Sequence, residues 1–85
     1  MTLAQIKSLR LTSLAPNQTI VRTVDQTIFM SYDSIIVVLD GSKTYLGKNW
    51  RYSKTTSKYR NQFLNETTPE TQAKLDNGTY LPLGD

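Results

Sequence analysis

Eleven consecutive residues, 50–60, combine cationic, aromatic and hydroxyl side chains without a carboxylate among them. Lysine and arginine neutralise phosphate charge, and hydroxyl groups donate hydrogen bonds to phosphate oxygens. Aromatic rings between them offer surfaces on which the bases of a single strand stack. The segment therefore predicts nucleic-acid binding dominated by phosphate contacts. The residues expected to contact phosphate are Lys48, Arg51, Lys54, Thr55 and Lys58, and those expected to stack on bases are Trp50 and Tyr52.

The distribution of charge supports an anionic partner. Residues 41–65 hold six cations and no acid, a charge of +6, whereas the rest of the chain sums to −3 and the whole to +3. A concentrated basic block favours binding to nucleic acid or to an acidic protein surface. A solvated basic face with no particular partner remains an open alternative.

A second candidate site is the polar stretch 31–34 between two expected strands. Tyr32 and Asp33 would bind a ligand there beside Thr55 and Thr56. The simpler interpretation is a bend in which Asp33 and Ser34 bond neighbouring backbone amides, and the composition favours it.

The missing residue types argue against most enzymes. The chain has neither histidine nor cysteine, which removes Ser-His and Cys-His nucleophiles, the common zinc sites and imidazole acid–base chemistry. The acids are scattered and lack metal-ligand spacing, so we expect no catalysis, no cofactor and no metal. The longest apolar run, 35–39, is far too short to span a bilayer, and the N-terminus lacks a signal-peptide core, so an intracellular protein without membrane contact is expected.

The elements that position these residues form one domain, 1–85, of the small α+β class. The pattern predicts an antiparallel, meander-like sheet with one main helix on a face and a short C-terminal helix. The consecutive apolar residues 35–39 predict a central strand with both faces covered. Alternation and turn residues predict strands at 8–12, 19–24, 27–32, 34–39, 43–46 and 50–52, with a possible edge strand at 79–81.

Helical periodicity begins after Ser53. Residues 56, 59, 60, 63 and 64 share one face, Ser53 or Thr55 would cap the first turn, and Lys54 and Lys58 lie opposite. Free amides at this helix start would add to an anion site if no side chain capped them. A second helix begins after Thr67 and ends before Gly78, with only Ala73 and Leu75 to bury.

The two polar segments carry a family resemblance. "MSYDSIIVV" together with "GKNWRYSKTTSKYRNQFL" resembles a group of small bacteriophage-encoded proteins of uncharacterised function. The chain departs from that pattern at three positions. It has Met30 where phenylalanine is usual, Ser34 where threonine is usual, and Tyr59 where histidine is frequent. The matching positions are 30–32, 34–38, 50, 52–53, 55–58 and 63–64.

This resemblance implies a viral origin and the host cytoplasm as the location. Because it pairs Ser31-Tyr32 with 55–57, it also implies that these segments meet, as a fold-defining polar junction or as a shared binding site. The leading hypothesis is a non-enzymatic phage accessory protein that binds nucleic acid. The alternative is a protein-interaction module, either an inhibitor of a host enzyme or a viral assembly component that docks on an acidic host or viral protein surface. A third possibility is a homo-oligomer that pairs through its apolar strand and exposed edges.

Overall fold

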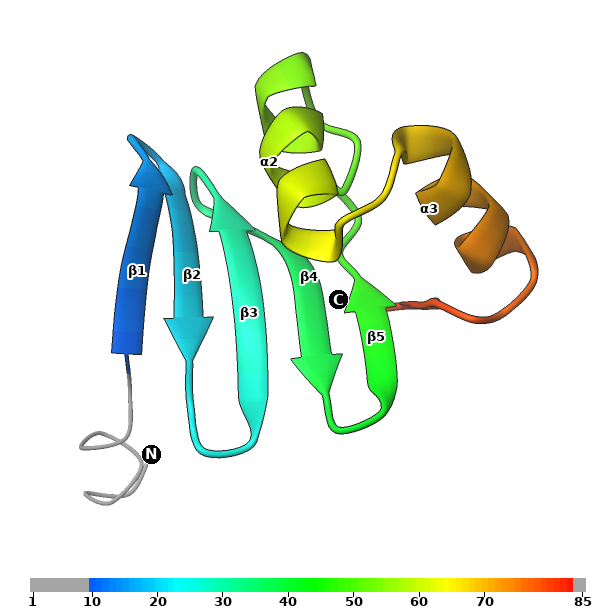
Figure 1. Cartoon of the computed structure of the whole chain (residues 1–85), viewed down its shortest axis with the longest axis horizontal. Coiled ribbons are helices and arrows are strands. Elements are labelled where there is room, and N and C mark those ends of the chain that lie inside the picture. Colours follow the sequence, from blue (N-terminus) through cyan, green and yellow to red (C-terminus); the bar gives the residue numbers. More distant parts are fainter. Residues whose placement is uncertain (1–9, 84–85) are drawn as a thin grey trace.

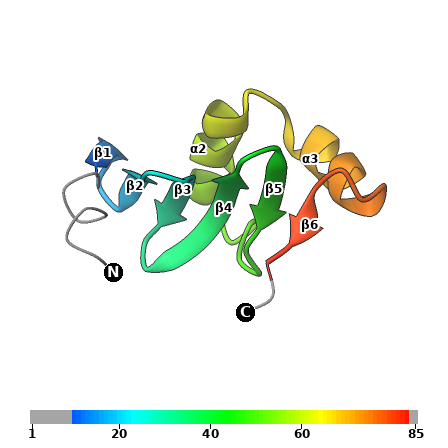
Figure 2. The same cartoon turned by 90° about the horizontal axis from the view of Figure 1, so that it is seen from below.

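The computed structural model describes residues 10–83. They form a six-stranded sheet in the order β1-β2-β3-β4-β5-β6, with both helices on one side of it (Figures 1 and 2). The predicted α+β class is confirmed. The strands are β1 Arg10–Ala15, β2 Gln18–Arg22, β3 Gln26–Ser31, β4 Ser34–Asp40, β5 Lys43–Leu46 and β6 Leu81–Pro82, and the helices are α2 Lys54–Leu64 and α3 Thr68–Asp76.

The first five strands form the predicted antiparallel meander, joined by tight turns. Asn17, Tyr32 and Gly41 adopt positive φ angles of 66°, 55° and 61° in three of these turns. Asparagine and glycine accept this conformation most easily, which explains why the turns lie where the sequence placed them. The first expected strand began two residues earlier, and its residues 8 and 9 lie outside the described part of the chain.

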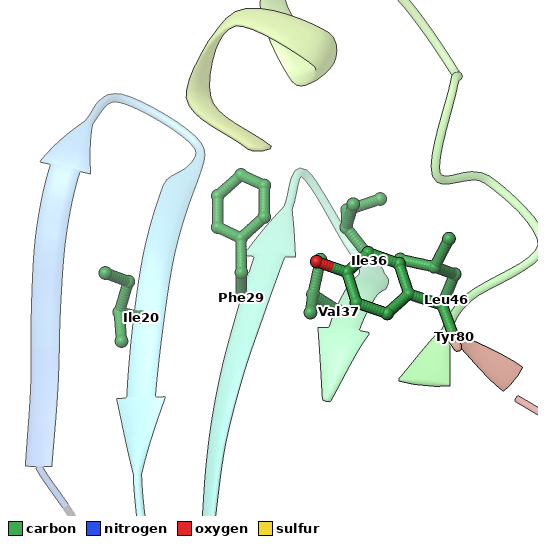
Figure 3. Packing of buried hydrophobic residues seen from close by; sticks show 6 residues of the cluster. All are labelled: Ile20, Phe29, Ile36, Val37, Leu46 and Tyr80. Atoms are coloured by element: carbon green, nitrogen blue, oxygen red, sulfur yellow. The ribbon is translucent and has the colours of Figure 1, made fainter. Parts of the chain in front are cut away.

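The hydrophobic core lies between the sheet and the helices. A row of cross-strand partners, Ile20, Phe29, Val37 and Leu46, runs beneath the helices (Figure 3). Phe63 of α2 stacks on Phe29 with ring centroids 5.6 Å apart. This row therefore fixes α2 over the middle of the sheet, since aromatic pairs add to the free energy of burial.

Strand β4 departs from the expectation that both its faces are covered. A bulge between the Phe29–Val37 and Met30–Ile35 pairs turns both Ile36 and Val37 into the core, and each is fully buried. Ile35 remains 37% exposed on the other face, which neither described helix covers. Val38 lies on that same face and is only 6% exposed, so the prediction of a two-sided cover holds for Val38 and fails for Ile35. The bulge accounts for the two consecutive apolar residues on the core face.

The predicted strand at 50–52 was also wrong. The amides of Trp50 and Tyr52 bond instead to the carbonyls of Gly47 and Asn49, three residues back, at 3.1 and 2.9 Å. These bonds make consecutive turns that lead into α2. The sixth strand of the sheet is β6, which pairs in parallel with β5, so the sheet is mixed. A parallel neighbour needs a crossover connection, which α2 and α3 supply.

Both helices begin at predicted caps. The Ser53 hydroxyl accepts a hydrogen bond from the Thr56 amide, and Thr67 forms a capping box with Glu70. In α3 the predicted burial of Ala73 was wrong, since Ala73 is exposed and Thr71 is buried in its place. Between residues 10 and 83, neither helix has the length and hydrophobicity needed to cross a membrane.

Candidate functional site

A buried polar junction joins the end of β3 to the first turn of α2. The hydroxyls of Ser31 and Thr56 lie 2.7 Å apart, and the Ser53 hydroxyl donates to Thr56 Oγ1 at 3.2 Å. Ser31 and Thr56 are both buried. The prediction that these two segments meet is therefore confirmed, and the burial of both hydroxyls favours a fold-defining junction over a shared binding site.

The same cap limits what the start of α2 offers to an anion. The Thr56 amide donates to Ser53 Oγ at 3.1 Å, and the Ser57 amide donates to the Ser53 carbonyl at 2.9 Å. An anion at a helix N-terminus needs free amides in this turn. The Ser53 cap therefore occupies the Thr56 amide, and the Ser57 amide makes the first bond of the helix, so neither of these two amides is free for an anion.

Two exposed tyrosines lie beside the junction. The rings of Tyr32, in the β3–β4 turn, and Tyr52, just before α2, meet edge to face with centroids 6.2 Å apart. Tyr32 is 50% exposed and Tyr52 is 67% exposed. The two rings therefore offer open aromatic surface at one end of the sheet. The sequence pointed to Tyr52 for stacking, but it treated Tyr32 only as a ligand or turn residue.

The predicted phosphate-contacting side chains are all exposed. Arg51 directly precedes Tyr52 in the sequence, and Lys54, Thr55 and Lys58 follow it within six positions. Within residues 10–83 the one ion pair joins Lys74 to Glu66, so no carboxylate neutralises these cations at close range. Arg51 donates to Gln72 Oε1 at 3.2 Å, and Lys58 lies 5.3 Å from the Tyr59 ring centroid.

Lys48 lies in a different setting. It lines a surface cleft of about 420 Å³ together with Asp33, Ser34 and Asn49, and the Asn49 side-chain amide donates to Ser34 Oγ at 3.0 Å. The Asp33 carboxylate brings negative charge to the same cleft. Lys48 is therefore a weaker candidate for phosphate contact than the cations of α2.

Trp50 is turned partly inward. It is half-buried and packs against the core cluster, and the guanidinium carbons of Arg51 and Arg60 lie 5.4 and 4.9 Å from its ring centroid. Arginine over an indole face is a favourable cation–π arrangement. Trp50 therefore belongs mainly to the packing between the turns and α2, which leaves Tyr52 as the more accessible of the two predicted stacking residues.

Arg60, the last cation of the basic segment, is fully buried. It donates to the Trp50 carbonyl, to Asn61 Oδ1 at 2.9 Å and to Thr68 Oγ1 at 2.6 Å, and so ties the turns before α2 to the start of α3. Burial, followed by the nearby charge of Arg51, lowers the pKa of the Arg60 guanidinium. Arg60 is a structural residue, and the basic surface is smaller than the sequence suggests.

Glu66 forms the other buried polar centre, between α2 and α3. Its carboxylate accepts hydrogen bonds from Lys74 Nζ at 2.9 Å, Thr71 Oγ1 at 2.6 Å and the Tyr80 hydroxyl at 2.6 Å. Burial opposes ionisation, but these three donors outweigh it and lower the pKa of Glu66. A carboxylate with its lone pairs so occupied holds the C-terminal segment in place. In the described part of the chain, no cluster of three potential metal ligands occurs.

The comparison with protein families identifies the chain. Residues 1–77 match the model of a family described as "Family of unknown function (DUF8033)", so the chain belongs to this family. No curated protein and no solved structure matches it.

Proposed function

We propose that this protein binds single-stranded nucleic acid without catalysis, through Tyr32 and Tyr52 together with Arg51, Lys54 and Lys58. The observation that supports this proposal is the exposed tyrosine pair beside cations that have no carboxylate partner within ion-pair distance. Non-specific single-strand binders combine these two components, a cationic track for the backbone and aromatic rings for the bases.

The placement of the side chains suits such a strand. Lys54 and Lys58 lie one helical turn apart on α2, about 6 Å along its axis. The tyrosine rings lie at the N-terminal end of the same helix, where Ser53 follows Tyr52 directly. A strand that stacks a base on Tyr52 would continue along the exposed side of α2. Thr55, also exposed, supplies a hydroxyl donor in the first turn.

The number of cations sets the expected response to salt. Three neutralised phosphates on a single strand give a slope of about −2 in log affinity against log salt. Raising monovalent salt from about 50 to about 200 mM should then weaken binding roughly 20-fold. Specificity for sequence should be low, because neither phosphate contact nor stacking discriminates strongly among bases.

A charge-reversal experiment tests the cationic part. Binding of a fluorescein-labelled 20-nucleotide oligothymidylate is measured by anisotropy for the wild type and for the double variant Lys54→Glu/Lys58→Glu. The matched control, Arg22→Glu/Lys43→Glu, makes the same change in net charge at two exposed residues at the opposite end of the sheet (Figure 1). We expect the first variant to lose at least about 20-fold in affinity and the control to lose much less. Equal losses would show that only net charge matters and would contradict a site on α2.

A second substitution tests the aromatic part. Tyr52→Ala removes an exposed ring and should weaken binding of the oligothymidylate by about 5- to 100-fold, from roughly 1–3 kcal/mol of stacking per base. Val24→Ala, at an exposed side chain in the β2–β3 turn, is the control. If Tyr52→Ala binds like the wild type, the tyrosines do not stack on bases. If the wild type binds no oligonucleotide at low salt, the proposal fails as a whole.

A viral setting is part of this proposal. The resemblance of residues 30–38 and 50–64 to small bacteriophage proteins supports an accessory role in the host cytoplasm. The same cations would also suit an acidic protein surface. That alternative predicts no oligonucleotide binding at any salt concentration.

A further inference from the structure

The sheet carries an unbroken row of apolar side chains on the face away from the helices. Consecutive cross-strand pairs link one residue from every strand, so the row crosses the whole sheet. Its members are Leu11, Val21, Ile28, Val38, Tyr45 and Leu81. A second pair, Met30 and Ile35, lies on the same face one step along the strands.

The strand register decides which side of the sheet this row occupies. Each member neighbours a residue of the core row, such as Ile28 beside Phe29 and Val38 beside Val37, and successive side chains in a strand point to opposite faces. Both helices lie on one side of the sheet, and Phe63 of α2 and Leu75 of α3 pack against the core cluster there (Figure 2). Leu11, Ile35 and Leu81 remain exposed on this face, Val21, Ile28 and Tyr45 are half-buried, and Val38 at the centre is only 6% exposed.

We propose that this face is the interface between two copies of the chain, packed sheet against sheet. The composition of β4 gives the first argument. The bulge places Ile36 and Val37 on the core face, but Ile35 and Val38 still present apolar side chains on the other face. Among residues 10–83 the helices cover one face only, and a second copy would cover the other.

Charge gives the second argument, because the face does not repel itself. The apolar row contains no charged residue. Beyond its edge, Asp40 and Lys43 face each other as a cross-strand pair of opposite sign, and Gln26 Nε2 donates to Asp40 Oδ2 at 3.2 Å. A nucleic acid or an acidic partner would require an excess of cations here. The unpaired cations Arg51, Lys54 and Lys58 belong instead to α2 and the turns before it.

The available area gives the third argument. Six strands spaced about 4.8 Å apart and about five residues long present roughly 400–500 Å² per copy before side-chain relief is counted. Two copies would bury about 1,000 Å², at the lower end for specific interfaces. We therefore expect a reversible dimer with a dissociation constant on the order of 100 µM rather than a permanent one.

Sedimentation equilibrium of the full chain at about 5–500 µM tests the proposal. The weight-average mass should rise with concentration from 9.7 kDa toward twice that value. Ile28→Lys, at the centre of the row, should raise the dissociation constant at least tenfold, because it brings two ammonium groups together in an apolar contact. If Ile28→Lys does not fold, as judged by circular dichroism, the exposed Ile35→Lys tests the same face.

Val24→Lys is the matched control. Val24 is 64% exposed in the β2–β3 turn, outside the apolar row, and this variant should dimerise like the wild type. A chain that stays monomeric across the whole range overturns the proposal. So does a dimer that persists in the Ile28 and Ile35 variants, since it would form elsewhere, for instance through the outer edge of β1.

Discussion

The buried junction between Ser31 and Thr56 should behave as one energetic unit. Thr56→Val keeps the shape of the side chain and removes the hydroxyl that accepts from Ser53 and bonds to Ser31. Ser31→Ala removes the other hydroxyl. Both positions are almost fully buried, so a hydroxyl that loses its partner cannot turn to solvent.

The expected magnitudes follow from that burial. Leaving a buried polar group unsatisfied costs about 1–3 kcal/mol, and Thr56→Val does so for Ser31. Thr56→Val also removes a hydroxyl that contacts Ser53, the N-cap of α2, so we expect it to lower the free energy of unfolding by about 2–3 kcal/mol. Ser31→Ala should lower the free energy of unfolding by about 1–2 kcal/mol. In the double variant neither hydroxyl is left behind, so its loss should fall short of the sum by about 1 kcal/mol.

Urea unfolding followed by tryptophan fluorescence measures all four proteins, because Trp50 is the single tryptophan and packs against the core. A Thr55→Val variant, one residue away and exposed, is the control and should change the free energy of unfolding by less than about 0.5 kcal/mol. Additive losses for Ser31→Ala and Thr56→Val would refute the hydrogen bond between them. A Thr55→Val effect as large as that of Thr56→Val would refute the assigned face of α2.

Two further predictions concern stability. The pKa of Glu66 lies below its ordinary value of 4.5 in the folded state, so ionised Glu66 stabilises the fold above that pH, and this stabilisation is lost as the pH falls below it. Glu66→Gln should lower the free energy of unfolding by roughly 2 kcal/mol at pH 7. In this variant the free energy of unfolding, measured in urea at pH 7, 5 and 3, should fall less steeply toward low pH. The same decrease in the free energy of unfolding from pH 7 to pH 3 in the variant and the wild type would contradict this role. Gly47→Ala should destabilise the fold by about 1–3 kcal/mol or more, because the added Cβ would lie 1.9 Å from the Ile35 carbonyl oxygen. Gly41→Asn is the control and should change the stability little, because no atom lies near its Cβ and asparagine tolerates the positive φ. Thermal unfolding measures both variants.

Much of the local structure was predictable because nearby residues determine it. The turns at Asn17 and Gly41, the caps at Ser53 and Thr67, and the five-strand meander all depend on side chains within a few positions. The exposure of Lys54 and Lys58 followed from helical periodicity in the same way.

The composition of the candidate site was predictable only in part. A list of cations gives no indication that Arg60 is sealed beneath Trp50 and bonded to Thr68, since these contacts cross from one helix to the next. Nor does it indicate that Tyr32 meets Tyr52, twenty positions away. The burial of Arg60 depends on how α3 and the turns before α2 pack around α2, and the tyrosine contact depends on where the β3–β4 turn lies relative to α2.

By itself, then, the sequence determined the α+β class, the helix starts, the turns and a basic segment rich in aromatics, because short-range sterics and hydrogen bonds specify them. Only the tertiary structure decided that 50–52 is a run of turns, that β6 joins in parallel, and that α2 and α3 lie on the same face of the sheet. The physical reason is that strand partners and helix placement depend on packing between residues far apart in the chain. Local propensity does not encode that packing.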